Sequence, residues 1–183
     1  MSQNIEKVAV LGAGTMGAQI AGHLANAGIP SCLFDISQEL AEKGVEILTT
    51  LKPAPLYKPK NASLIEACNY DDHLDKVKDA DWIVEAVVEN LDIKHKVYNN
   101  IADYIKNTAI ISSNTSGIPL GDLTQVMSDD VKSRFLITHF FNPPRYMRLL
   151  ELVKGPDTSD DIYNDMAIFG ENVLGKGVVH AKD

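Results

Sequence analysis

Three glycines near the start of the chain have a spacing that suits phosphate binding. Gly12, Gly14 and Gly17 follow an apolar run over residues 8–11, and a helical pattern begins directly after Gly14. The first glycine permits a sharp exit from a strand, the second lets a pyrophosphate approach the backbone, and the third lets the helix pack against the strand. The phosphates bind at the helix N-terminus, where unpaired N–H groups and the positive end of the helix dipole meet. The pattern therefore predicts a dinucleotide-binding site.

An acidic residue follows at the distance that such a site requires. A second apolar run ends in Asp35, about 20 residues beyond the glycines, where a carboxylate can accept a hydrogen bond from a ribose 2′-hydroxyl. A 2′-phosphate would meet a like charge there, and residues 36–38 offer no arginine to receive it. We therefore expect the cofactor to be NAD rather than NADP.

His139 and Glu151 are the best candidates for acid–base chemistry. If the runs 134–139 and 147–153 pair as antiparallel strands around the double proline between them, the two side chains approach each other across the hairpin. Glu151 would then orient His139 and fix its tautomer, and His139 could act as a general base near neutral pH. A lone histidine near a strand end is more often structural, so this expectation depends on the acid that holds it.

Polar residues near two other strand ends are further candidates for the site. Glu85 lies within the apolar run 81–87, where a carboxylate is costly unless it is paired or protonated, and Glu89 follows the exit of that run. Lys94 could reach the same ligand, although an exposed helix charge is the commoner role of a lysine. Residues 112–117, Ser-Ser-Asn-Thr-Ser-Gly, bring hydroxyl and amide groups to the next strand end, although such clusters also form ordinary turns.

The proline-rich segment 52–60 has two interpretations. In the first interpretation, the segment is a solvated excursion between two structural units, as long loops often are. Alternatively, it is a platform for a phosphorylated ligand, in which Lys58 and Lys60 contact phosphate and Tyr57 offers a stacking face. The sequence leaves both interpretations open.

Composition excludes several classes of function. The chain has 183 residues and a formal net charge of −8, which argues against a general nucleic-acid or membrane-surface binder. We find no apolar stretch of the roughly 18–20 residues that a membrane span needs. Cys32 and Cys68 match no metal-binding spacing, so we expect free thiols, no metal site and a cytoplasmic location.

Apolar, β-branched runs alternate with helical patterns along the chain. This alternation predicts one α/β domain over residues 1–183, of the Rossmann type, with a doubly wound, mostly parallel sheet and a C-terminal antiparallel strand pair. The expected strands lie near residues 7–11, 30–34, 81–87, 108–112, 134–139, 147–153 and 176–180. The expected helices lie near residues 15–27, 37–51, 92–105 and 159–173, and Ser37 is expected to cap the second of them.

With these motifs in place, the chain resembles the N-terminal domain of L-3-hydroxyacyl-CoA dehydrogenases, in particular the large bacterial fatty-acid oxidation type. The matching segments follow the family's order over essentially the whole chain: VAVLGAGTMG, DADWIVEAVVEN, SSNTSG, HFFNPPRYMRLLELV and LGKGVVHAKD. The resemblance implies NAD-dependent oxidation of an L-3-hydroxyacyl-CoA to the 3-oxoacyl-CoA in β-oxidation. It makes His139 and Glu151 the catalytic dyad and lets Ser116 bind the substrate's 3-oxygen. The expected cofactor-binding residues are Gly12, Gly14, Thr15, Met16, Gly17, Asp35, Glu89, Lys94 and Asn142.

The resemblance also implies what would accompany this domain. In the family, a helical domain follows a segment like Lys182-Asp183 and supplies a catalytic asparagine, most dimer contacts and one wall of the acyl-CoA cleft. We therefore expect a homodimer only together with that domain, and an acyl-CoA as the substrate partner. Two alternatives stay open: an NAD-binding module without turnover, and a dehydrogenase of another small hydroxy acid.

Overall fold

The computed structural model describes residues 4–183 as one sheet with helices on both faces. The strands are β1 (Val8–Leu11), β2 (Ser31–Asp35), β3 (Ile65–Asn69), β4 (Trp82–Glu85), β5 (Ile110–Ser113), β6 (Phe135–Phe140), β7 (Leu149–Lys154) and β8 (Gly177–Ala181). The α-helices are α1 (Thr15–Asn26), α2 (Gln38–Thr50), α3 (Leu91–Ile101), α4 (Leu120–Leu123), α5 (Asp129–Lys132) and α6 (Asp160–Asn172). Four short 3-10 helices connect them: η1 (Pro59–Leu64), η2 (Leu74–Asp79), η3 (Ala102–Tyr104) and η4 (Thr124–Val126).

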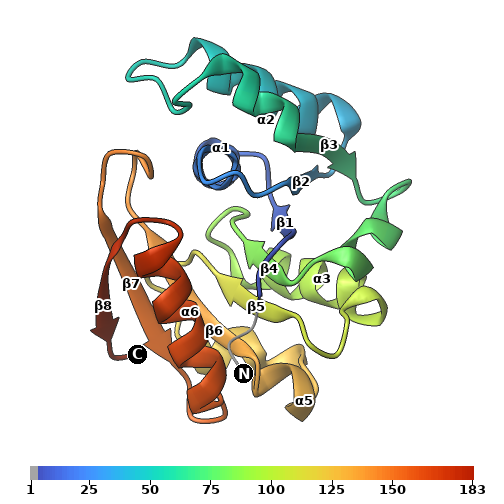
Figure 1. Cartoon of the computed structure of the whole chain (residues 1–183). Coiled ribbons are helices and arrows are strands. Elements are labelled where there is room, and N and C mark those ends of the chain that lie inside the picture. Colours follow the sequence, from blue (N-terminus) through green and yellow to red (C-terminus); the bar gives the residue numbers. More distant parts are fainter. Residues whose placement is uncertain (1–3) are drawn as a thin grey trace.

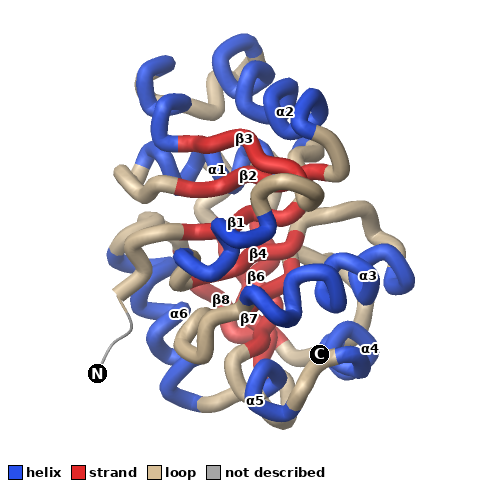
Figure 2. The backbone as a smooth tube through the Cα atoms, turned by 90° about the vertical axis from the view of Figure 1, so that its right-hand side faces the viewer, coloured by secondary structure: helices blue, strands red, loops and turns tan. Residues whose placement is uncertain are grey.

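The eight strands form one continuous sheet in the order β3-β2-β1-β4-β5-β6-β7-β8. All pairings among strands β1 to β6 are parallel, β7 pairs antiparallel with β6, and β8 runs parallel to β7. Figure 2 shows this succession from β3, beside α2, to the strands at the other end. The strand order reverses its direction of growth between β1 and β4. In sheets of this type the ligand crevice lies at that point, outside the carboxyl ends of the strands.

Alternating side chains divide the core into two layers. Val8 and Val10 of β1 face a buried cluster that includes residues of α1, α2 and α6, whereas Ala9 and Leu11 face a second cluster built with α3 and α4. Figure 1 shows α1 and α6 on one side of the sheet and α3 on the other. Both faces of the sheet are thus covered, as expected for parallel strands that are apolar throughout.

Most of the expected elements are present, and the antiparallel pairing of the runs around the double proline is confirmed. Ser37 caps α2, because its hydroxyl accepts a hydrogen bond from the Leu40 N–H at 3.3 Å. The prediction missed β3 and the short helices α4 and α5. The β3 segment, Ile-Glu-Ala-Cys-Asn, is short, occupies the sheet edge and contains residues of low strand propensity, so its pattern is weak.

Both cysteines are free, as expected, and the structure shows that both are buried. Within residues 4–183, we find no helix that is long and apolar enough to cross a membrane.

A buried histidine connects α1 to the loop before β8. The Nε2 atom of His23 lies 3.0 Å from the Leu174 carbonyl oxygen, and the side chain is almost fully enclosed. Burial, helped by the nearby positive charge of Lys176, lowers the pKa of His23 from 6.5 to about 4. Lys176 is itself buried, and its ammonium donates to the carbonyls of Pro144 and Met147 in the double-proline turn.

These contacts predict a loss of stability in mild acid. As the pH falls from 6.5 to about 4, the unfolded chain protonates His23 before the folded protein does, so the free energy of unfolding decreases by up to about 3 kcal/mol. In His23→Gln this contribution disappears, and the difference between wild type and variant changes with pH over that window. His180→Gln, on an exposed side chain, serves as the control in urea denaturation at several pH values. Parallel curves for wild type and His23→Gln would contradict the assignment.

Candidate functional site

The glycine turn between β1 and α1 depends on close backbone approach. Gly12 has a φ of +103°, and a Cβ there would lie 2.7 Å from the Ala86 carbonyl oxygen. A Cβ on Gly17 would lie 1.7 Å from the Gly12 carbonyl oxygen, which no side chain could tolerate. Around Gly14 a Cβ would meet nothing within 4 Å. Two of the glycines therefore serve packing, and the third leaves open space in front of the helix.

The N-terminus of α1 has the properties of an anion site. Gly14 is its N-cap, no side-chain cap is formed there, and its first turn carries no acidic residue. The first N–H groups of the helix are thus left for a ligand, and the helix dipole favours a negative charge. A pyrophosphate fits this arrangement.

Asp35, at the end of β2, lies beside the glycine turn. One carboxylate oxygen accepts a hydrogen bond from the Ala13 N–H at 2.8 Å, and the other accepts from the Ile36 N–H at 2.7 Å. These bonds fix the orientation of the carboxylate, and each oxygen keeps a lone pair for a ligand hydroxyl.

Three neighbouring cavities follow the carboxyl ends of the strands. The outer cavity, of about 310 Å³, includes Gly12, Gly14 and Asp35 in its lining. The central cavity, of about 470 Å³, is lined among others by Gly14, Thr15, Met16, Glu89, Lys94, Asn114, Ser116, His139, Phe141 and Asn142. The lateral cavity, of about 630 Å³, includes Ser116, His139 and Glu151. Of the catalytic and cofactor-binding residues that the family resemblance implies, all except Gly17 line one of the three, although they come from distant parts of the sequence.

The cavities share residues, which places them in order. Gly14 lines both the outer and the central cavity. Ser116 and His139 line both the central and the lateral cavity. The crevice therefore runs from Asp35 past the glycine turn to His139, and a second space opens beyond.

His139 and Glu151 meet across the antiparallel pair. They are direct partners in the register of β6 and β7, and His139 Nδ1 lies 2.9 Å from Glu151 Oε2. The two side chains are 20% and 35% exposed, so both are within reach of a ligand. The Phe141 ring packs against the imidazole, with 4.5 Å between the ring centroids. The imidazole is thus held at one nitrogen by a carboxylate and on its side by an aromatic ring.

Glu85 is a fully buried carboxylate that is completely paired. It lies at the end of β4 and accepts a hydrogen bond from the Lys94 ammonium at 2.7 Å and from the Val87 N–H at 2.8 Å. Its other oxygen accepts from the Tyr98 hydroxyl at 2.9 Å and the Ser113 hydroxyl at 2.6 Å. The expectation that this acid must be paired is met by donors from α3, β5 and the loop after β4.

Lys94 is buried at the wall of the central cavity, where the sequence alone made an exposed helix charge the commoner role. Its side chain is 1% exposed, and its ammonium contacts Glu85 and, at 3.2 Å, Glu89. Glu89 also accepts hydrogen bonds from the Thr115 hydroxyl and the Ser116 N–H. Desolvation raises the pKa of Glu89, but the hydrogen bond from Thr115 and the charge of Lys94 outweigh it and lower the pKa.

Several residues of the site carried no strong signal in the sequence. Asn114 accepts a hydrogen bond from the Phe140 N–H at 2.8 Å and so joins β5 to the strand that carries His139. Gln19 of α1 donates to the Asn142 side chain at 3.1 Å. Tyr70 lines the outer cavity. The position of Asn114 within the Ser/Asn cluster at a strand end was the one available signal.

The segment 52–60 is anchored away from the crevice. The Arg145 guanidinium donates to the carbonyls of Ala54 and Leu56, and it lies 4.6 Å from the centroid of the Tyr57 ring. Neither Tyr57 nor the two lysines after it line any of the three cavities. Within the described residues, this geometry favours the interpretation of an excursion between two structural units over that of a phosphate platform.

Comparison with known proteins gives a consistent match. A family model described as "3-hydroxyacyl-CoA dehydrogenase, NAD binding domain" matches residues 7–183. A "Probable 3-hydroxyacyl-CoA dehydrogenase" of Bacillus subtilis is 47% identical over 204 residues, which cover 100% of this chain and 26% of the relative. A protein of the same name from Deinococcus radiodurans is 47% identical over 186 residues, covering 98% of this chain and 54% of the relative.

Solved structures agree with the sequence relatives. The (S)-3-hydroxybutyryl-CoA dehydrogenase PaaH1 from Ralstonia eutropha is 32% identical and superposes with a TM-score of 0.86, covering 98% of this chain and 64% of that one. FadB2 of M. tuberculosis gives a TM-score of 0.88 at 30% identity, covering 98% of this chain and 64% of that one. The chain spans 26% and 54% of the two curated relatives above. With a family match over nearly its whole length, the chain belongs to the NAD-binding domains of 3-hydroxyacyl-CoA dehydrogenases.

Proposed function

We propose that this chain is part of an enzyme that oxidises an L-3-hydroxyacyl-CoA to the 3-oxoacyl-CoA with NAD, as in fatty-acid β-oxidation. The observation that carries the proposal is the His139–Glu151 pair at the border of the central and lateral cavities. A general base at this point lies where a nucleotide in the crevice and a second ligand beside it would meet. The names of the relatives support the same reaction.

Different residues of the crevice would bind different parts of the cofactor. The glycine turn and the first turn of α1 would hold the pyrophosphate, and Asp35 would accept hydrogen bonds from the adenosine ribose. Glu89 and Asn142, in the central cavity, would face the nicotinamide half. Bound NAD supplies the hydride acceptor, and the protein supplies position and electrostatics.

His139 would remove the hydroxyl proton of the substrate. Glu151 engages Nδ1, which leaves Nε2 as the nitrogen that takes the proton. The carboxylate then stabilises the imidazolium that forms and keeps the ring in place. Ser116 would donate a hydrogen bond to the substrate oxygen, on which negative charge develops as its proton leaves.

Lys94 would act on the cofactor through Glu89 rather than by direct contact. Its ammonium is enclosed by two carboxylates, so its effect on a ligand passes through the carboxylate that faces the central cavity. In the same way, Gln19 would hold the Asn142 side chain in place from α1.

The first prediction from this assignment concerns cofactor choice. Because Asp35 would repel a 2′-phosphate, NAD should bind at least about tenfold more tightly than NADP, which corresponds to ~1.4 kcal/mol. In Asp35→Asn the ratio should fall towards unity. Asp71→Asn makes the same charge change on an exposed residue outside the crevice and should leave the ratio unchanged. Calorimetric titration of both cofactors measures the ratios, and equal affinities in the wild type would exclude the role of Asp35.

The second prediction concerns the dyad and is measured with the whole protein and 3-hydroxybutyryl-CoA. Glu151→Gln and His139→Gln should each lower kcat by roughly 10²–10⁴, the scale on which general-base function is lost. NAD affinity should change little, since neither side chain is assigned to the adenosine half. Glu171→Gln, an exposed residue of α6, is the matched control. A Glu151→Gln enzyme with nearly full kcat would make Glu151 a structural residue.

The third prediction tests the buried ion pair. Lys94→Met leaves the Glu85 carboxylate buried without a cation, so the free energy of unfolding should fall by about 3–5 kcal/mol. The double variant Glu85→Gln/Lys94→Met removes both charges and keeps a side-chain oxygen as the acceptor for the Tyr98 and Ser113 hydroxyls, so it should recover part of this loss. Lys96→Met, exposed on the same helix, should change stability by less than about 0.5 kcal/mol. If Lys94→Met unfolds at the same urea concentration as the wild type, the pair does not support the loop after β4.

A further inference from the structure

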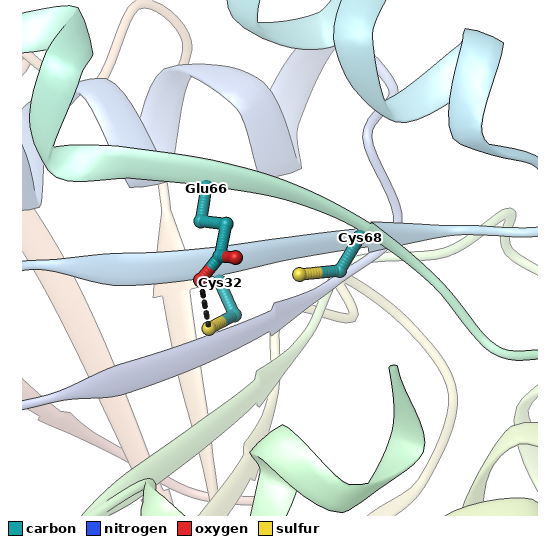
Figure 3. Close-up of side chains that lie close together, drawn as sticks. All are labelled: Cys32, Glu66 and Cys68. Carbon is teal, nitrogen blue, oxygen red and sulfur yellow. Dashed lines mark hydrogen bonds between the residues drawn. The ribbon is translucent and has the colours of Figure 1, made fainter. Parts of the chain in front are cut away.

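Two thiols and a carboxylate come together on the sheet, away from the crevice residues described above. The parallel register of β2 and β3 pairs Cys32 directly with Glu66, and Cys68 lies two residues further along β3 on the same face. Figure 3 shows the three side chains pointing toward one another from these adjacent strands. Cys32 Sγ lies 3.9 Å from Glu66 Oε2, and the two sulfur atoms and the carboxylate oxygen all lie within 4.8 Å of one another.

These separations are close to those of a coordination sphere. Zinc binds thiolate sulfur at about 2.3 Å and carboxylate oxygen at about 2.0–2.2 Å. At tetrahedral angles these bond lengths place ligand atoms about 3.5–3.8 Å apart. The contacts of 3.9 Å and up to 4.8 Å exceed these separations by up to about 1.3 Å, so the side chains would have to move closer by about that amount to bind the ion.

A neighbouring lysine fixes the orientation of the Glu66 carboxylate. Lys76 binds one oxygen of Glu66, and the other oxygen is the one that approaches Cys32. Carboxylates that bind metals are commonly oriented by a hydrogen bond to a second group, and Lys76 supplies such a bond here. The two thiols are buried, whereas the Glu66 side chain is 53% exposed, so an ion and a water ligand could enter from the carboxylate side.

We propose that Cys32, Glu66 and Cys68 bind a thiophilic divalent cation of the Zn²⁺ and Cd²⁺ type, with water as the fourth ligand. Binding breaks two S–H bonds and forms two metal–sulfur bonds, and both protons pass to solvent. Two thiolates and one carboxylate give the site three negative charges. The divalent ion neutralises two of them, and the remaining negative charge faces Lys76. The ion would link the edge strand β3 to β2. Asp35 ends β2 and Tyr70 follows β3, and both residues line the outer cavity. The proposal is independent of the catalytic assignment.

The chain has only two cysteines, which makes the test specific. Addition of Cd²⁺ to the reduced protein should produce an ultraviolet thiolate-to-metal charge-transfer band that saturates at one equivalent per chain. About two protons should be released per ion in weakly buffered solution. Zn²⁺ should displace the bound Cd²⁺, so that the band disappears, and it should raise the Tm of the protein. Cys32→Ser and Cys68→Ser should each abolish tight binding, and Glu66→Gln should weaken it at least about tenfold, or ~1.4 kcal/mol.

Controls separate this site from other effects. Glu46→Gln, an exposed carboxylate of α2, should bind Cd²⁺ like the wild type. The Tm increase caused by NAD confirms that each cysteine variant is folded. Because both thiols are buried, they should react with a thiol reagent only slowly, when β3 opens, and Zn²⁺ should slow this reaction further in the wild type, which tests the site without any substitution. Three results would each overturn the proposal. They are absence of the band, saturation at half an equivalent because one ion bridges two chains, and normal binding by a folded Cys68→Ser variant.

Discussion

The crevice depends on one buried carboxylate. Glu85 has no contact with solvent, yet it stands at the end of the central strand β4, where burial of a charge costs several kcal/mol unless donors surround it. Its donors come from the loop after β4, from β5 and from α3. Satisfying this single group therefore fixes three segments relative to one another, and all three border the site.

Polar contacts extend from Glu85 along the strand ends to the His139–Glu151 pair. Lys94, held by Glu85, also contacts Glu89, and Glu89 in turn receives hydrogen bonds from Thr115 and the Ser116 backbone. The Asn114 N–H donates to the Glu85 carbonyl oxygen, while the Asn114 side chain accepts from the N–H that follows His139. The wall of the central cavity and the strand that carries His139 are thus connected by polar contacts rather than by packing alone. In a narrow crevice, such contacts fix directions that apolar packing leaves free.

The sequence was most informative where one residue type is sterically or chemically required. Only glycine fits at Gly17, and an acid at Asp35 follows from the length of one βαβ unit, so both could be predicted. The dyad was predictable because the double proline forces a turn, and the turn sets the antiparallel register that pairs His139 with Glu151. Lys94 was harder, since nothing in a helical pattern distinguishes a lysine that reaches a buried carboxylate from one that faces water. That distinction requires knowing that Glu85 points towards α3.

The cluster of Cys32, Glu66 and Cys68 could not be predicted from the sequence, because it forms through strand pairing. Cys32 and Cys68 are separated by a helix and a proline-rich excursion, and no short motif joins them. They meet only because β3 adds to the sheet edge beside β2, in the register that places Glu66 next to Cys32. β3, like β8 at the other edge, has a strand partner on one side alone, so backbone pairing constrains it less than the inner strands. A cross-strand ligand set would add a second link between β3 and the rest of the sheet. It would do so on the two strands that lead to Asp35 and Tyr70, and thereby to the outer end of the nucleotide crevice.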